Sequence, residues 1–343
     1  MAVIIPVAGR SSRFPNTRPK YLLTMHTGKL MLETAIEPYL KNHDIHIAIL
    51  KEHNEKYFVA NLINRMYKDR KNLHLHILDK ETSGPAETVY MISKNLPDNE
   101  PLFIKDCDSF FTGEFRKDNH ICVVDLRKNL DITKVAAKSF AVTNNQMMIT
   151  NVVEKSVVSN YICVGGYGFS NAKEYNDAFK NIDCANEIFV SHVIKYMLEN
   201  KNFVANEVTN YIDVGTYNEF VNYNQSKTTI FCDIDGTVFY NQSRLFENNY
   251  SQEPTPIPNS VKYLLQKQKG GCKIIFVTSR PKSFKDITEK KLNECGFKNY
   301  VVVYDLPHAP RTLINDYSTT NPYPTAISIN VPRDNNDYWI DKR

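Results

Sequence analysis

Residues Val3–Leu23, VIIPVAGRSSRFPNTRPKYLL, contain the pattern that decides the fold of the first half of this chain. The stretch opens as an apolar run typical of a buried strand and then changes into a loop of small residues. Small residues let backbone N–H groups approach a polyphosphate, and neighbouring cations supply the charge that a triphosphate requires. The small residues are Gly9, Ser11 and Ser12, and the cations are Arg10, Arg13 and Lys20. The stretch therefore predicts a strand followed by a phosphate-binding loop.

The spacing of this loop differs from two common phosphate-binding motifs. No Gly-Lys-Ser/Thr follows it, as in a P-loop, and the three glycines of the dinucleotide fingerprint are missing. The loop resembles the start of sugar-phosphate nucleotidyltransferases, whose pattern is roughly Ala-Gly-x-Gly-Ser/Thr-Arg followed by Pro-Lys. The matching residues are Ala8, Gly9, Arg10, Ser12, Arg13, Pro19 and Lys20, with Ser11 in place of the second glycine. The resemblance implies nucleotide binding by residues 8–12 and catalytic roles for Arg13 and Lys20.

The length and composition of the chain limit its class. With 343 residues two domains are expected, and no apolar run approaches the ~20 residues that cross a bilayer. We expect a soluble cytoplasmic protein whose apolar first residues are a strand and not a signal peptide. The net charge of +4 arises from interleaved acids and bases, which gives no argument for nucleic-acid binding. Seven scattered cysteines without a Cys-x-x-Cys pair predict neither a zinc site nor a disulfide framework.

Apolar patterns after the loop predict alternating strands and helices. Leu30–Asn42 has helical spacing, His46–Leu50 the pattern of a strand, and Leu73–Leu78 alternates with a period of two. His74 and His76 share one face of this last strand, and two histidines at that spacing can hold a metal. Hydrogen-bonded or solvated edge residues are the favoured interpretation, because no third type of ligand clusters nearby in the sequence.

Residues Thr82–Tyr90 form a turn that runs into a predicted helix. Gly84 permits the bend, and Pro85 suits the first helical turn. The segment resembles the nucleobase and ribose segment of the nucleotidyltransferases, Gly-x-Ala-x-x-Val. The resemblance implies nucleotide contacts at Gly84 and Ala86, and a plain helix N-terminus is the alternative.

Two carboxylates follow the apolar strand that starts at Pro101. Asp106 and Asp108 are one residue apart at the carboxyl end of this strand, where open α/β sheets place their ligands. Both carboxylates can turn toward one Mg2+ ion. In the resembling family, an aspartate at this strand end holds the metal that bridges the nucleotide phosphates, which implies Asp108 as ligand and Asp106 as second candidate. The same Asp-x-Asp also occurs in metal-dependent glycosyltransferases of related fold.

Two later segments resemble the part of the family that binds the acceptor. A Glu-Lys pair precedes the glycine-rich stretch Tyr161–Phe169, which implies substrate contacts at Glu154, Lys155 and Gly165. A salt-linked surface pair is the competing interpretation of the Glu-Lys pair. Further on, an Asp-x-Gly-Thr element implies Asp213 as the second metal carboxylate. The resemblance covers about residues 2–225 in the order of the family.

A second complete pattern begins after the polar stretch at residues 222–228. The sequence TIFCDIDGTV, from Thr229, is an apolar strand followed by Asp-x-Asp-Gly-Thr, and it resembles motif I of the haloacid dehalogenase (HAD) phosphatases. A carboxylate is a competent nucleophile toward phosphorus when a Mg2+ ion screens its charge. The resemblance implies that Asp233 attacks, that Asp235 is the general acid and base, and that both belong to the metal site.

The remaining HAD motifs are matched in part. The resemblance implies that Thr278, after the strand from Lys273, binds the phosphoryl group, and that Asp316, ending a strand from Leu313, is a metal ligand. The cation is expected at Arg311, with three alternatives, and many members of the superfamily carry an acid where this chain has Asn315. The three alternatives are Arg280, Lys282 and Lys285. The sequence thus leaves open a phosphatase and a fold retained for binding or stability. One late strand, Ala326–Val331, is expected in the tail.

Together these patterns predict an α/β protein of two domains. Residues 1–225 are expected to form a GT-A-like, Rossmann-like nucleotidyltransferase domain with a mixed sheet, and residues 226–343 a small HAD-type domain. The expected substrates are an NTP, with a lean to CTP, and a phosphorylated sugar or small alcohol, and Mg2+ is expected in both domains. A glycosyltransferase and a nucleotide-binding regulatory protein with inactive sites are the alternatives. The sequence leaves open a homo-oligomer.

Overall fold

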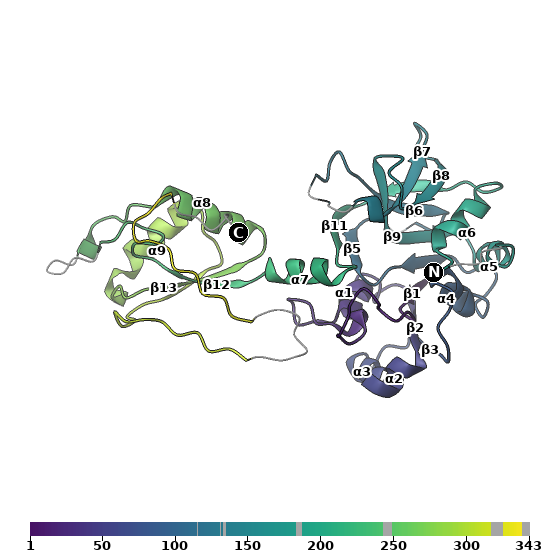
Figure 1. Ribbon diagram of the computed structural model, residues 1–343, viewed down its shortest axis with the longest axis horizontal. Helices are drawn as coiled ribbons and strands as arrows, with labels where there is room; N and C mark the ends of the chain where they lie inside the picture. The colour runs from purple at the N-terminus through teal and green to yellow at the C-terminus, as the bar shows by residue number, and fades with distance from the viewer. Residues whose placement is uncertain are drawn as a thin grey trace. The chain divides into compact units, whose positions relative to one another are not determined.

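The computed structural model describes residues 1–114, 116–130, 132, 135–182, 187–242, 249–316 and 325–337. The chain divides into two compact units, Met1–Glu219 (unit 1) and Phe220–Arg343 (unit 2). Figure 1 shows the helices and strands of each. The domain boundary expected between residues 225 and 226 stays a prediction.

Unit 1 is built on a mixed sheet whose central strands are parallel. The strand order is β10-β6-β9-β4-β1-β2-β3, and the pair β7 and β8 joins the sheet through β9. β1 runs parallel to β2 and β4, whereas β9 runs antiparallel to β4 and β6. The strand bounds are β1 Ala2–Pro6, β2 Asp44–Leu50, β3 Leu73–Leu78, β4 Leu102–Lys105, β6 His120–Asp125, β7 Ser139–Thr143, β8 Ile149–Glu154, β9 Tyr161–Phe169 and β10 Val204–Glu207. The expected mixed α/β sheet is confirmed.

Strand β1 has the residues of a strand that is covered on both faces. Its first four residues are buried and its sequence is nearly all apolar, as in the central strands of parallel sheets. Three helices, which contact one another, pack apolar residues into the same core as β1, β4 and β9 (Figure 1). They are α4 Pro85–Ser93, α5 Ala172–Lys180 and α6 Val190–Met197.

The other elements of unit 1 surround this sheet. A small antiparallel sheet pairs β5 with β11, so that Ser109 lies opposite Asp213. This pairing brings the segment after β4 to the end of β11. The bounds are β5 Ser109–Thr112, β11 Thr209–Asp213, α1 Met31–Ile36, α2 Lys51–Tyr57 and α3 Val59–Met66. Helix α7, Tyr217–Gln225, contains the division between the two units.

Unit 2 contains a parallel sheet of three strands in the order β12-β13-β14 among its described residues. Two helices contribute Leu264 and Leu292 to its core, which also contains Cys232, Ile274 and Phe276. The bounds are β12 Thr229–Asp233, β13 Lys273–Val277, β14 Val301–Val303, α8 Pro258–Lys269 and α9 Lys285–Glu294. The strands predicted from Thr229 and from Lys273 are thus present as β12 and β13.

Two predicted strands, the last HAD strand from Leu313 to Asp316 and the strand Ala326–Val331 in the tail, are wrong. Residues 313–316 and 326–331 form no strand. In the first segment Ile314 is 89% exposed, and in the second Ile327 is 60% exposed. A strand is stable when it has a neighbouring ladder and a buried face, and these apolar side chains have little burial to stabilise one.

Candidate functional site

The loop after β1 lines a cavity of about 1090 Å3 in unit 1. Ser11 has a left-handed backbone with φ of 56°, the conformation for which glycine is better suited. Its Oγ atom accepts a hydrogen bond from the N–H of Lys20 at 3.1 Å, which ties the loop to the short helix Lys20–Leu22. The lining includes all the loop residues that were predicted to bind the nucleotide, namely Ala8, Gly9, Arg10, Ser11 and Ser12.

The second predicted nucleotide segment is only partly at this cavity. Gly84 lines it and precedes α4, but Ala86 is fully buried in the core. The N–H of Ala86 donates to the carbonyl of Ile188, and its own carbonyl accepts from the hydroxyl of Tyr175. A direct nucleotide contact at Ala86 does not fit this placement, because the residue packs the helix against the sheet.

Lys20 meets Asp108 in this cavity. The Lys20 Nζ atom lies 2.6 Å from Asp108 Oδ2, and the guanidinium of Arg13 lies 3.8 Å from the same oxygen. Burial raises the pKa of Asp108, but Lys20 and Arg13 outweigh this effect and hold the pKa well below its usual range. The basic loop and the end of β4 thus form one charged cluster.

Asp213 lies on the other side of this cluster. Its Oδ2 atom forms an ion pair with Lys138, and its Oδ1 atom accepts from the N–H of Gly215 at 2.9 Å. A Cβ atom on Gly215 would lie 3.0 Å from both Asp108 Oδ2 and Asp213 Oδ1. The missing side chain at Gly215 therefore leaves room between the two carboxylates.

These residues fit a magnesium ion. Mg2+ is bound in proteins by one or two carboxylates together with phosphate oxygens and water, and Asp108 and Asp213 supply two hard oxygen donors beside an open space. Among the described residues, no three His, Cys, Asp or Glu side chains are gathered closely enough to hold a metal by themselves. A metal ion at this site would therefore need phosphate oxygens or water as ligands in addition to the two carboxylates.

Asp106, the second candidate ligand, lies against Gly165. The N–H of Asp106 donates to the carbonyl of Gly165 at 2.8 Å, and a Cβ atom on Gly165 would clash with the Asp106 carboxylate. Burial and the neighbouring charge of Asp108 raise the pKa of Asp106. Gly165 was expected to admit the substrate, and although it lines the cavity, its lack of a side chain makes room for Asp106.

The predicted acceptor residues Glu154 and Lys155 line the same cavity. Ser139 Oγ lies 2.7 and 2.8 Å from the two carboxylate oxygens of Glu154, and the Lys155 Nζ atom lies 5.4 Å from the ring centroid of Phe189. Each side chain thus has its own partner, which differs from the surface pair that was the alternative interpretation.

Sequence reasoning missed Lys138 and Ser139. Both line the cavity at the start of β7, in a stretch that matches none of the motifs. The antiparallel pairing of β7 with β8 places Ser139 opposite Glu154. The only signal in the sequence is the apolar alternation of β7, which does not identify its partner strand.

The HAD-like site in unit 2 gathers two aspartates, each with an arginine. Arg311, one of the candidate cations, places Nη2 3.1 Å from Asp233 Oδ1. Burial raises the pKa of Asp233, although Arg311 opposes this effect. Thr237 donates to Asp233 Oδ2 at 3.2 Å.

Asp235 is held by Arg280, whose side chain is fully buried. Arg280 Nε lies 2.9 Å from Asp235 Oδ2, and Nη2 lies 2.8 Å from Asp235 Oδ1. Thr278, which was expected to bind a phosphoryl group, donates to Asp235 Oδ2 at 3.2 Å. The alternative cation Arg280 therefore orients Asp235, and Thr278 takes part in the same network.

The described residues of unit 2 do not complete the expected magnesium site. Asp316 forms no three-carboxylate group with Asp233 and Asp235, because the strand that would carry it is absent. Its carbonyl instead accepts from the hydroxyl of Thr325. The donor set is thus two carboxylates that are each neutralised by an arginine.

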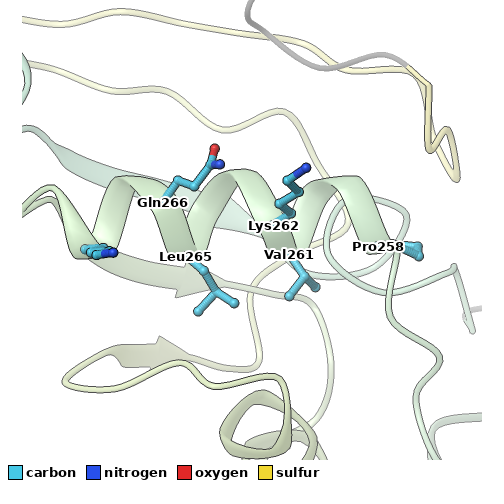
Figure 2. Close-up of a pocket in the computed structure, with 6 residues that line it drawn as sticks. Pro258, Val261, Lys262, Leu265 and Gln266 are labelled. Atoms are coloured by element: carbon cyan, nitrogen blue, oxygen red, sulfur yellow. The ribbon is translucent and has the colours of Figure 1, made fainter. Parts of the chain in front are cut away.

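A second concavity, of about 410 Å3, lies along α8. Figure 2 shows Val261 and Leu265 on one side of the helix and Lys262 and Gln266 on the other. It contains no acid, histidine or cysteine, and it is separate from the aspartates of unit 2.

The family model of the HAD superfamily, subfamily IIIB (acid phosphatase), matches residues 169–308. The match includes Asp233, Asp235, Thr278 and Arg280 and ends before Arg311. It also begins inside unit 1, at the end of β9. The predicted resemblance of the C-terminal region to the HAD superfamily is confirmed. No curated protein matches the chain.

Unit 1 is similar to solved nucleotidyltransferases. The nucleoside-diphosphate-sugar pyrophosphorylase of Vibrio cholerae RC9 is 20% identical, with a TM-score of 0.55 over 65% of this chain and 99% of that one. The inositol-1-phosphate CTP transferase of T. maritima is 12% identical, with a TM-score of 0.51 over 64% and 90%. A UDP-glucose pyrophosphorylase is 15% identical, with a TM-score of 0.52 over 66% and 97%. The predicted nucleotidyltransferase fold is confirmed.

In the part of the chain that the structure describes, no helix has the length and apolar character to cross a membrane.

Proposed function

We propose that unit 1 transfers a nucleoside monophosphate from an NTP to a phosphorylated sugar or small alcohol and releases pyrophosphate. The observation that carries this proposal is the meeting of Lys20 and Asp108, at 2.6 Å, inside a cavity large enough for both substrates. The nucleotidyltransferase fold supports it. A glycosyltransferase is disfavoured, because a donor diphosphate needs less cationic binding than the loop with Arg10, Arg13 and Lys20 provides.

In the proposed reaction, an oxygen of the acceptor phosphate attacks the α-phosphorus, and the bond to the β-phosphate oxygen breaks. Pyrophosphate leaves with the bonding electron pair, and no covalent enzyme intermediate is needed. Lys20 and Arg13 neutralise the charge that grows on the phosphoryl oxygens. Asp108 and Asp213 would hold a magnesium ion, which supplies further charge neutralisation when bound. The enzyme's contribution is positioning and electrostatic stabilisation.

The nucleotide we propose is CTP. Unit 1 is short, and a CTP transferase is among the structures of similar fold. A matrix of the four NTPs against phosphorylated sugars and polyols, measured by pyrophosphate release, tests both substrates.

Lys20→Ala and Asp213→Asn should each lower transfer at least ~100-fold, because each removes charge stabilisation in the transition state. Near-parent kcat/KM in both variants would overturn the site assignment.

For unit 2 we propose hydrolysis of a phosphomonoester, with Asp233 as the nucleophile and Arg311 as the cation that receives the phosphate. The contact between Arg311 and Asp233 and the HAD family match support this assignment. A second function, phosphate binding without hydrolysis, is favoured because the described residues contain no group of three carboxylates that could hold a metal ion. Turnover of p-nitrophenyl phosphate, with and without Mg2+, distinguishes the two.

We propose that both reactions belong to one cytoplasmic pathway, such as the supply of precursors for a surface polysaccharide.

A further inference from the structure

Lys138 is a cation in the centre of the unit 1 site to which no motif assigns a role. Its side chain is only 18% exposed and forms an ion pair with Asp213, whose side chain is 17% exposed. An ammonium group at this depth in a substrate cavity has few solvent contacts and requires an anionic partner.

The backbone of Lys138 is fixed to the acceptor segment. Its carbonyl accepts a hydrogen bond from the N–H of Lys155 at 3.0 Å, and the next residue, Ser139, binds Glu154. Lys138 therefore reaches Asp213 from the side of the cavity where Glu154 and Lys155 lie. Lys20 reaches Asp108 from another segment, which follows the loop proposed to bind the nucleotide.

The two lysines neutralise the two carboxylates that fit a magnesium ion. A cation bound between Asp108 and Asp213 would compete with each lysine for its carboxylate and would make that lysine available to another anion. For Lys20 that anion is the triphosphate. Resting on the function proposed for unit 1, we infer that Lys138 binds the acceptor phosphate, a phosphomonoester dianion, after a metal ion has replaced it at Asp213.

In this role Lys138 touches the attacking group. It holds the acceptor phosphate while one of its oxygens forms the bond to the α-phosphorus and pyrophosphate leaves with the electrons of the broken bond. A dianionic acceptor needs no proton transfer in this step. The positive charge of Lys138 lowers the repulsion between the acceptor and the NTP, and its removal should cost about 100-fold in kcat/KM for the acceptor.

The test uses the full chain with Lys138→Met and Lys138→Arg, and Lys128→Met as the matched control. Lys128 forms an ion pair with Glu207 but is 63% exposed. Binding of Mn2+ alone, followed by electron paramagnetic resonance, should be roughly 10-fold tighter in Lys138→Met, because a competing cation is gone. Lys138→Arg should keep the parent affinity for Mn2+ and recover part of the lost acceptor kcat/KM. Lys128→Met should change neither quantity.

Unchanged or weaker Mn2+ binding in Lys138→Met would overturn the exchange at Asp213. Tighter Mn2+ binding with parent-like KM and kcat for the acceptor would overturn the role at the acceptor phosphate. If the parent protein releases no pyrophosphate with any pair of NTP and acceptor, the proposed function has failed, and the Mn2+ titration still decides whether Lys138 competes with a metal. Unchanged melting temperatures of the variants would exclude misfolding as the cause.

Discussion

At the scale of single residues, Ser11 has a strained backbone conformation and also fixes the position of Lys20 in the site. It keeps a left-handed backbone without being glycine, and its hydroxyl accepts the N–H of Lys20. We expect Ser11→Gly to be more stable than Ser11→Ala by about 1 kcal/mol, because both lose the hydroxyl and only alanine retains the cost of a positive φ. Urea unfolding of the two variants measures this difference. Equal stability would show that the loop relaxes away from φ of 56°.

The two carboxylates after β4 should differ in their contribution to metal binding. Asp108 faces Asp213 across Gly215, whereas Asp106 packs against Gly165 and has a raised pKa. We expect Asp108→Asn to weaken Mn2+ binding at least ~10-fold, as loss of a metal-site residue does, and Asp106→Asn to weaken it less. The exposed Asp69→Asn is the control. The opposite order in a Mn2+ titration would exchange the two assignments.

The role of a residue can be predicted from the sequence when the other residues of the site are close to it along the chain, and not when strand pairing brings them together. Arg13 and Lys20 lie within one loop, and their spacing alone brings them to the same cavity. Lys138 reaches the cavity because β7 pairs with β8, and nothing in its neighbouring residues records that pairing. Ala86 shows the opposite case, since the motif implies a nucleotide contact at a position whose side chain is buried in the core.

At the scale of elements, strands β2 and β3 carry a cluster of histidines. His46 Nδ1 lies 3.0 Å from His76 Nε2, and the ring of His46 stacks on that of His74. Burial lowers the pKa of His46 to about 4, helped by His74 and His76 and opposed by Asp44. This hydrogen bond agrees with the favoured interpretation of the histidines as bonded residues.

The lowered pKa of His46 predicts a loss of stability in acid. Between pH 6.5 and about 4 the unfolded chain binds a proton at His46 that the folded protein does not, so stability falls as the pH falls through this window. We expect a loss of about 2 kcal/mol, allowing for partial screening by solvent. Urea unfolding of the parent and His46→Phe at several pH values measures it. Parallel pH profiles would contradict the prediction, and pH 7.5, where the imidazole is neutral in both states, is the reference.

The elements that were predicted wrongly lack a partner. Strands β1 and β12 each have a neighbouring strand in a sheet, and a motif follows each of them; the sheet buries the apolar run of β1 and Cys232 of β12. The segment at residues 326–331 alternates apolar and polar side chains, but this pattern shows only that one face of a strand would differ from the other. Whether a neighbouring strand is available depends on the fold, and for this segment the structure provides none.

At the scale of the whole molecule, the chain combines two units that each have their own sheet, core and charged site. The carboxylates of the two sites are neutralised differently. In unit 1 the shortest ion pairs are made by Lys20 and Lys138, with Arg13 further from Asp108, whereas in unit 2 both aspartates pair with arginines. A lysine is a compact point charge on a flexible stem, whereas the planar fork of an arginine holds a carboxylate in one orientation. We therefore expect a metal ion to displace the lysines of unit 1 more easily than the arginines of unit 2.

The two units should be chemically independent, so that one substitution silences one activity. Asp233→Asn keeps the shape of the side chain but removes the nucleophile, because a neutral amide oxygen attacks phosphorus poorly. Turnover of p-nitrophenyl phosphate should be lost, while pyrophosphate release continues at the parent rate.

A chain ending at residue 225 should fold and keep nucleotidyl transfer, since the core of unit 1 consists of its own strands and helices. Phosphate release that survives Asp233→Asn would show that this aspartate is not the nucleophile, and an insoluble 1–225 fragment would show that the boundary is misplaced.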